Sequence, residues 1–195
     1  YCSNFFMLHE MTQIRAGVAS GFLLLCIKPI FDRNLIKFLF FAILGLSFHY
    51  TAILIFPLWF ISSNPRKKLL FFLIPFAYFL FFLGINLITT IPIPGIEEKI
   101  EMYKQLQELG GDDSKPINVF NLYQLAKIGL YYFLLFKYDT IIQHNKYAII
   151  LMKIFCLSLM VVPIFATMQV FGFRISELYG IVEIVLFPLI FYIFK

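Results

Sequence analysis

The most constraining feature of this sequence is a series of long apolar stretches separated by short charged or turn-forming segments. A helix needs about 20 mostly apolar residues to cross the hydrocarbon core of a bilayer. Of the 195 residues, 61% are hydrophobic and only 14% are charged, whereas a soluble domain is about 45–50% apolar and about 25% charged. The sequence therefore predicts an all-α, polytopic membrane protein rather than a soluble domain or a nucleic-acid-binding module. Five full spans are expected, at 13–31, 69–91, 119–137, 147–171 and 178–194.

A sixth apolar stretch, 36–61, is interrupted in its middle by the polar sequence SFHYT around His49. It could form one long tilted span, or two half-helices that meet at His49. Basic clusters flank it at 28–37 and 66–68, and short loops rich in Lys and Arg usually lie in the cytoplasm. Two half-helices that return to the same side would leave both clusters cytoplasmic, so we favour the broken, re-entrant form. Such a break is tolerated only where protein or a water-filled cavity surrounds it.

This topology places residues 1–12 and the segment 92–118 on the extracytoplasmic side. Within that segment, 96–109 has apolar residues at helical spacing with charges on the other face, and the pair Gly110-Gly111 supplies a stop. We expect an amphipathic loop helix there, which could lie on the outer leaflet or pack on the bundle. Because the chain starts without Met, 1–195 is expected to be a single transmembrane domain that forms part of a longer chain.

Charged residues in or near the spans carry most of the functional information, because a charge at the bilayer centre costs about 2.5–3.5 kcal/mol on insertion scales. At the entrance of the first span, Glu10, Gln13 and Arg15 cannot all face lipid cheaply. Arg15 could face a polar cavity at the outer surface. Alternatively, it could extend to the headgroup phosphates or pair with Glu10.

Two further groups of ionisable residues lie deeper in the apolar stretches. His49 could be an ordinary interhelical hydrogen-bond partner, or an acid or base placed at a helix break. Arg174 and Glu177 are three residues apart, so they could form a simple ion pair on a helix. With Glu183 inside the last span, they could instead hold an arginine between carboxylates so that it faces a cavity.

The predicted topology brings Arg15 and Arg174 to the same, external surface. The planar guanidinium group meets phosphate oxygens in pairs, so two arginines beside a histidine suit an anionic, lipid-linked diphosphate. The sequence has no DxD pattern of the kind that holds a metal. We therefore expect chemistry that needs neither a metal nor a cofactor.

Three motifs in this order resemble the EpsG family of Wzy-type polysaccharide polymerases. They are Glu10-Met-Thr-Gln13-Ile-Arg15-Ala-Gly-Val-Ala19, Ser47-Phe-His49-Tyr-Thr51-Ala52 and Arg174-Ile-Ser-Glu177. The resemblance implies a membrane glycosyltransferase of exopolysaccharide, capsule or O-antigen synthesis, which polymerises repeat units carried on undecaprenyl diphosphate. It also implies a bacterial cytoplasmic (inner) membrane location with an extracytoplasmic active site. A chain-length regulator and a flippase of the same pathway are the partners it suggests.

The same resemblance suggests a role for each candidate residue. The expected catalytic residues are Arg15, His49, Arg174 and Glu177, and the expected substrate-binding residues are Glu10, Gln13 and Glu183. The arginines would hold the diphosphate, while His49 or a carboxylate (Glu10 or Glu177) would accept the proton of the attacking hydroxyl. A flippase for lipid-linked sugars, a membrane acyltransferase that modifies glycans and a non-catalytic scaffold are the alternative functions.

Overall fold

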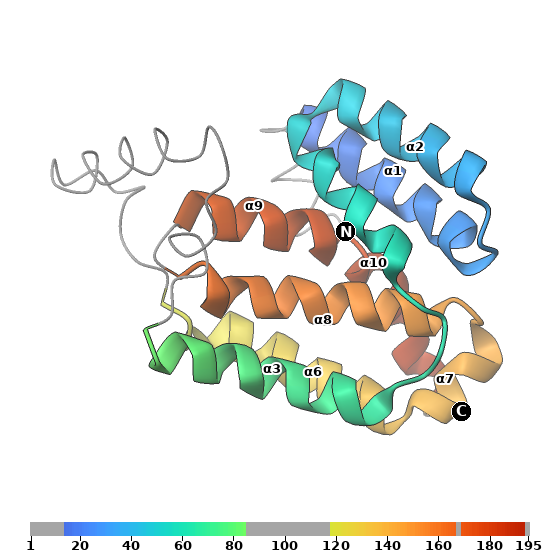
Figure 1. Cartoon of the computed structure of the whole chain (residues 1–195). Coiled ribbons are helices and arrows are strands. Elements are labelled where there is room, and N and C mark those ends of the chain that lie inside the picture. Colours follow the sequence, from blue (N-terminus) through green and yellow to red (C-terminus); the bar gives the residue numbers. More distant parts are fainter. Residues whose placement is uncertain (1–13, 85–117, 167–168, 194–195) are drawn as a thin grey trace, which may run out of the picture.

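A computed structural model describes residues 14–84, 118–166 and 169–193 (Figure 1). All regular secondary structure in these ranges is helical, which confirms the all-α prediction. The amphipathic helix predicted at 96–109 lies outside the described residues. The helices are α1 (Ile14–Phe31), α2 (Leu35–Phe48), η2 (Tyr50–Phe60), α3 (Lys67–Phe82), α6 (Leu122–Phe136), α7 (Tyr138–His144), α8 (Ala148–Ile164), α9 (Gln169–Gly180), α10 (Glu183–Leu186) and η4 (Phe187–Tyr192).

The predicted break at His49 is confirmed. α2 ends at Phe48, His49 is extended with φ −151° and ψ 132°, and the 3₁₀ helix η2 starts at Tyr50. Figure 1 shows η2 running back alongside α2, so the pair forms a helical hairpin. The arms have 14 and 11 residues, about 21 and 22 Å, against about 30 Å of hydrocarbon core. These lengths favour the re-entrant form.

Close packing at Gly45 brings the two arms of the hairpin together below His49. A Cβ at Gly45 would lie 3.2 Å from the Cβ of Phe22 in α1 and 3.4 Å from the Cβ of Ala52 in η2. A larger side chain would push α1 or η2 away from α2. Gly45 therefore sets how closely the hairpin approaches α1.

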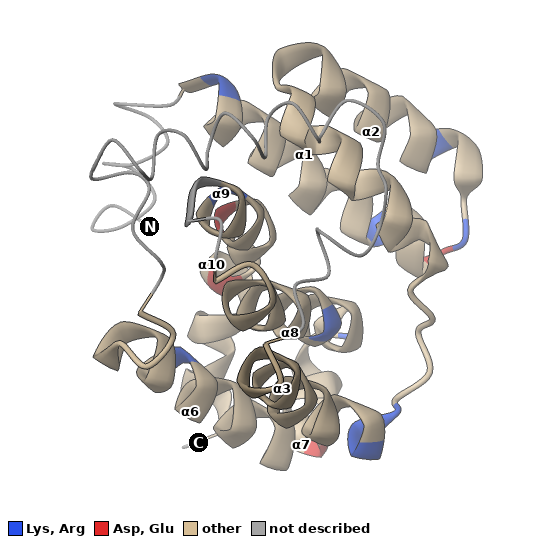
Figure 2. Cartoon of the chain, turned by 60° about the vertical axis from the view of Figure 1, so that its left-hand side comes forward, with Lys and Arg blue, Asp and Glu red and all other residues tan. Residues whose placement is uncertain are grey.

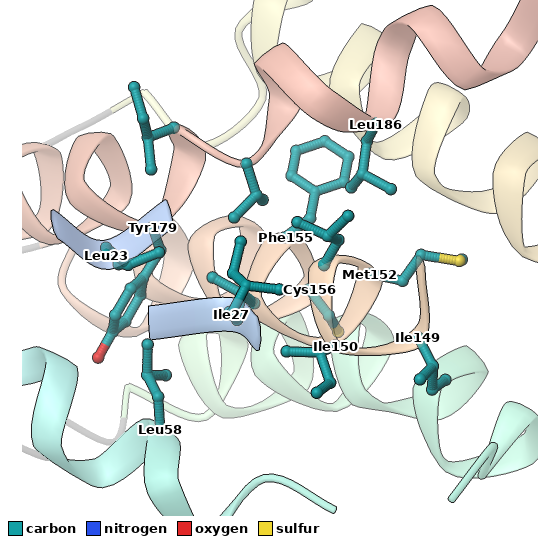
Figure 3. Packing of buried hydrophobic residues seen from close by; sticks show 14 of the residues in the cluster. Leu23, Ile27, Leu58, Ile149, Ile150, Met152, Phe155, Cys156, Tyr179 and Leu186 are labelled. Carbon is teal, nitrogen blue, oxygen red and sulfur yellow. The ribbon is translucent and has the colours of Figure 1, made fainter. Parts of the chain in front are cut away.

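The centre of the bundle is α8, in which 13 of 17 residues are buried. A helix that is apolar all round must be covered on every side, and Figure 3 shows how this is done. Leu23 and Ile27 of α1, Leu58 of η2, Tyr179 of α9 and Leu186 of α10 gather around α8 in one cluster. The hairpin and the C-terminal helices are thus parts of one hydrophobic core.

Two helical stretches in the described part of the chain are long and apolar enough to cross a bilayer. One is α1 (Ile14–Phe31), and the other is Phe171–Tyr192, which runs from α9 through α10 and η4. The first agrees with the predicted span at 13–31. The second corrects the predicted span at 178–194, because the helix already begins at Gln169. The charged stretch around Arg174 lowers the local hydropathy, but it does not interrupt the helical backbone. Arg174 and Glu177 therefore lie inside α9 and not in a turn before it.

Candidate functional site

The candidate site lies at the end of the bundle where the α2–η2 hairpin turns. We call this end the His49 pole and define it by Arg15 in α1, His49 and Tyr50 at the hairpin turn, and Arg174 in α9. In Figure 1 the start of α1, the hairpin turn and the start of α9 all lie at the left-hand end of the bundle. Glu10 and Gln13 lie outside the described residues.

Two hydrogen bonds hold α9 in place beside the hairpin. The Tyr179 hydroxyl donates to the carbonyl oxygen of Leu54 in η2 at 2.8 Å. The Ser158 hydroxyl of α8 donates to the carbonyl oxygen of Ser176 at 2.7 Å. These contacts lie on either side of Glu177 and within two turns of Arg174, so they fix the position of α9 relative to the hairpin.

Arg174 and His49 are connected through Tyr50. The Arg174 Nη1 group donates to the Tyr50 hydroxyl at 2.8 Å, and the Tyr50 ring stacks on the His49 ring at a centroid distance of 4.6 Å. Tyr50 is 58% exposed, so this row of three side chains is open to its surroundings.

The His49 ring is oriented by the start of η2. Its Nδ1 accepts a hydrogen bond from the Thr51 backbone N–H at 3.3 Å and lies 2.7 Å from the Thr51 hydroxyl oxygen. An N-cap acceptor satisfies one of the unpaired N–H groups at a helix start. Because a ring nitrogen that accepts carries no proton, the neutral ring in this arrangement has its proton on Nε2.

Both arginines of the pole act electrostatically on His49. Burial lowers the pKa of His49 below its ordinary value, and the positive charges of Arg174 and Arg15 lower it further. Like charges nearby disfavour the imidazolium form. The His49 pole therefore combines two cations with a neutral imidazole, an arrangement that suits an anionic ligand.

Behind Arg174, a row of charged residues leads into the bundle. The charges of Arg174 and Lys127 both act on the Glu177 carboxylate. Lys127 of α6 also forms an ion pair with Glu183 of α10, with 2.6 Å between Nζ and Oε1. Glu183 is 3% exposed, and Figure 2 shows the acidic positions of α9 and α10 near the middle of the bundle.

The model of the EpsG family matches the chain over residues 1–195. The chain belongs to the EpsG family. The amylovoran biosynthesis protein AmsC of Erwinia amylovora is 27% identical over 199 residues. That alignment covers 96% of this chain and 50% of the relative, so the chain spans about half the length of that protein. No solved structure matches the chain.

This EpsG-family chain, a membrane protein by its composition, brings together three of the residues expected to be catalytic. Arg15 and Arg174 lie close enough to His49 for their charges to act on it, Arg174 is joined to the pole through Tyr50, and Glu177 lies one turn from Arg174 on α9. Glu183 has a different environment from the one expected, because it faces Lys127. Groups of three or more metal-ligating side chains are not found in the described part of the chain.

Two residues of the site were missed by sequence reasoning. Tyr50 stands inside the quoted His49 motif, but the sequence gives it no role of its own. Lys127 is a single lysine in the middle of the expected span 119–137. An ionisable residue inside a span is a functional candidate by default, so that signal could have revealed it.

Proposed function

We propose that this chain forms part of a membrane glycosyltransferase that polymerises oligosaccharide repeat units carried on undecaprenyl diphosphate, for exopolysaccharide biosynthesis. The observation that carries the proposal is the cluster of Arg174, Tyr50, His49 and Arg15, which three separate helical segments bring to one pole. Membership of the EpsG family and similarity to an amylovoran biosynthesis protein support the same conclusion.

The two arginines bind the diphosphate of the donor. A guanidinium group presents N–H donors in a planar fork that matches phosphate oxygens. As the bond to the sugar breaks, negative charge grows on the diphosphate, and cations that are already in place stabilise it without reorganisation. The hydroxyl of Tyr50 orients Arg174 by accepting from Nη1.

The reaction forms one glycosidic bond and breaks another. An acceptor sugar hydroxyl attacks the anomeric carbon of the donor glycan, and the bond between that carbon and the diphosphate oxygen breaks. The undecaprenyl diphosphate leaves with the bonding electron pair. The hydroxyl proton passes to a base, so atoms and charge balance without a metal or a cofactor.

Three bases were expected, of which Glu10 lies outside the described residues, and the contact between His49 and Thr51 favours Glu177 over His49. The neutral ring that accepts from the Thr51 N–H has its proton on Nε2, so it can donate to a diphosphate oxygen but cannot accept a proton there. Glu177 is the carboxylate that shares electrostatic contact with Arg174. We therefore assign to His49 a hydrogen bond from Nε2–H to the leaving diphosphate. We assign to Glu177 the role of the base that accepts the hydroxyl proton.

The proposed location is the bacterial inner membrane, with the His49 pole on the extracytoplasmic side. The loops 32–34 and 61–66, beside which the basic clusters at 28–37 and 66–68 lie, are at the other end of the hairpin (Figure 1). This is the arrangement that the positive-inside bias favours. The lipid-linked donor and acceptor, the bilayer, a chain-length regulator and a flippase of the same pathway are the proposed partners.

The test is polymer synthesis by the purified full-length protein with a lipid-linked repeat unit. Arg15→Ala and Arg174→Ala should each abolish long polymer while the protein still inserts into membranes. Wild-type polymer length from both variants would contradict the proposal. Transfer of the substrate across vesicles without new glycosidic bonds would support a flippase instead, a function for which broken helices are also typical.

A further inference from the structure

The bundle contains a buried ion pair that binding and transfer at the His49 pole do not explain. Lys127 and Glu183 side chains are 14% and 4% exposed, and their charged atoms are 2.6 Å apart. Lys127 also lies 4.4 Å from the ring centroid of Tyr123. Burying two charges loses several kcal/mol of hydration for each, and their attraction offsets this only when the geometry is good. A buried ion pair with this loss of hydration therefore calls for an explanation.

The charges around Lys127 follow an alternating order. Arg174 and Glu177 are three residues apart on α9, the spacing of neighbours on one helix face, and Lys127 pairs with Glu183. The charges of Arg174 and Lys127 both favour the carboxylate form of Glu177. The four residues come from α9, α6 and α10 and carry two positive and two negative charges. The set is balanced in the wild type, and only Arg174 extends from it to the His49 pole, where it donates to Tyr50.

We propose that Lys127 is a positioning residue that keeps Arg174 at the His49 pole. Lys127 neutralises the buried carboxylate of Glu183, so Arg174 has only the half-buried Glu177 to balance and stays on Tyr50. This inference rests on the proposed diphosphate site and adds the means by which that site retains its arginine.

The consequence of losing Lys127 follows from the charge count. Lys127→Met leaves Glu177 and Glu183 with Arg174 as the one remaining cation of the set. A buried carboxylate without a partner is strongly unfavourable, so Arg174 turns inward and its contact with Tyr50 is lost. The double variant Lys127→Met with Glu183→Gln removes one charge of each sign. It leaves Arg174 and Glu177 balanced, as they are in the wild type.

The experiment measures the affinity of the purified full-length protein for two probes, farnesyl diphosphate and inorganic diphosphate, at equal amounts of folded protein. Lys127→Met should weaken binding of both by about 10- to 100-fold, the value of a charge-assisted hydrogen bond. The double variant should recover to within about threefold of the wild type. Weaker binding of farnesyl diphosphate alone would place the effect on the lipid tail, and would contradict the proposal.

Lys153→Met is the matched control, because it also removes a partly buried lysine. Lys153 donates to the carbonyl oxygens of Ser62 and Asn64 at the far end of the hairpin. This variant should lower thermal stability and leave both affinities unchanged. A purely structural role for Lys127 predicts the same behaviour for Lys127→Met, and that result would overturn the proposal.

Two more outcomes are decisive. Equal weakening in the single and double variants would show that charge balance is not what holds Arg174, and would overturn the inference. A wild-type protein that binds neither probe would overturn the diphosphate site itself, and with it the proposed function. The two failures are therefore distinguishable in one set of measurements.

Discussion

The two ends of the α2–η2 hairpin use the same types of residue for different purposes. At the end opposite the His49 pole, which we call the Arg33 pole, Arg33 donates to the carbonyl oxygens of Trp59 at 2.7 Å and Ile61 at 2.6 Å. These bonds join the start of α2 to the end of η2 and close the hairpin. At the His49 pole, Arg174 donates instead to the hydroxyl of an exposed tyrosine.

Two lysines at the Arg33 pole also have partners within the protein. Lys153 donates to two backbone carbonyls of the loop 61–66, and Lys67 forms an ion pair with Asp139 at 2.7 Å. Carbonyl groups that would otherwise lack a donor are satisfied in this way. The comparison teaches that the contacts of a cation, and not its residue type, distinguish one that supports the fold from one that is left open to its surroundings.

The prediction with the largest expected effect is that the two poles lie on opposite sides of the membrane. Single cysteines at Asn64 and Asn118, both exposed in the structure, should react with an impermeant reagent from opposite sides of intact cells. Cys26 and Cys156 are buried and should stay silent, and Cys2 is replaced in the parent. Labelling of both positions from outside would contradict the re-entrant hairpin.

A matched pair of substitutions then separates the roles of the two arginines. Arg174→Lys keeps the charge but loses the planar fork, so polymer synthesis should fall by about 100-fold or more, as it does when a preorganised donor is removed. Arg33→Lys should cost little activity, because a lysine can hold backbone carbonyls, as Lys153 does. Both are measured as polymer formed per folded protein. Similar losses in the two variants would remove the distinction between the poles.

The third prediction concerns the proton position on His49. If Nε2–H donates to the leaving diphosphate, His49→Gln keeps an amide donor and most of the activity, while His49→Ala loses about tenfold, the value of one hydrogen bond. A general base predicts a loss of about 10²–10⁴-fold in both variants. The measurement is initial polymerisation rate at saturating substrate. Equal, large losses would assign the base role to His49.

Sequence reasoning could find the hairpin but not its surroundings. The break at His49 was predictable because the polar SFHYT sequence interrupts an apolar run between two basic clusters, and both signals are local. The start of α9 was not, because hydropathy falls around Arg174 while the backbone stays helical. The prediction that Arg15 and Arg174 lie on the same side of the bundle followed from the expected topology alone.

The pairing of Lys127 with Glu183 could not be predicted in the same way. The two residues are far apart in the chain and on different helices, α6 and α10, so their contact depends on how these helices pack around α8. Neither hydropathy nor helical spacing contains this information. The sequence led us to expect Glu183 near Arg174, whereas in the folded arrangement its partner is Lys127.

The smallest expected effect belongs to Tyr50→Phe, which sharpens the comparison between the poles. The variant keeps the ring that stacks on His49 and removes only the hydroxyl that accepts from Arg174. Because Tyr50 is exposed, water can replace that acceptor, so donor affinity should fall by only about threefold and the fold should be unaffected. Tyr50→Ala removes the stacking as well and should cost more. Equal effects of the two variants would mean that the hydroxyl alone positions Arg174, whereas no effect of either would exclude Tyr50 from the site and leave Glu177 as the residue that orients Arg174.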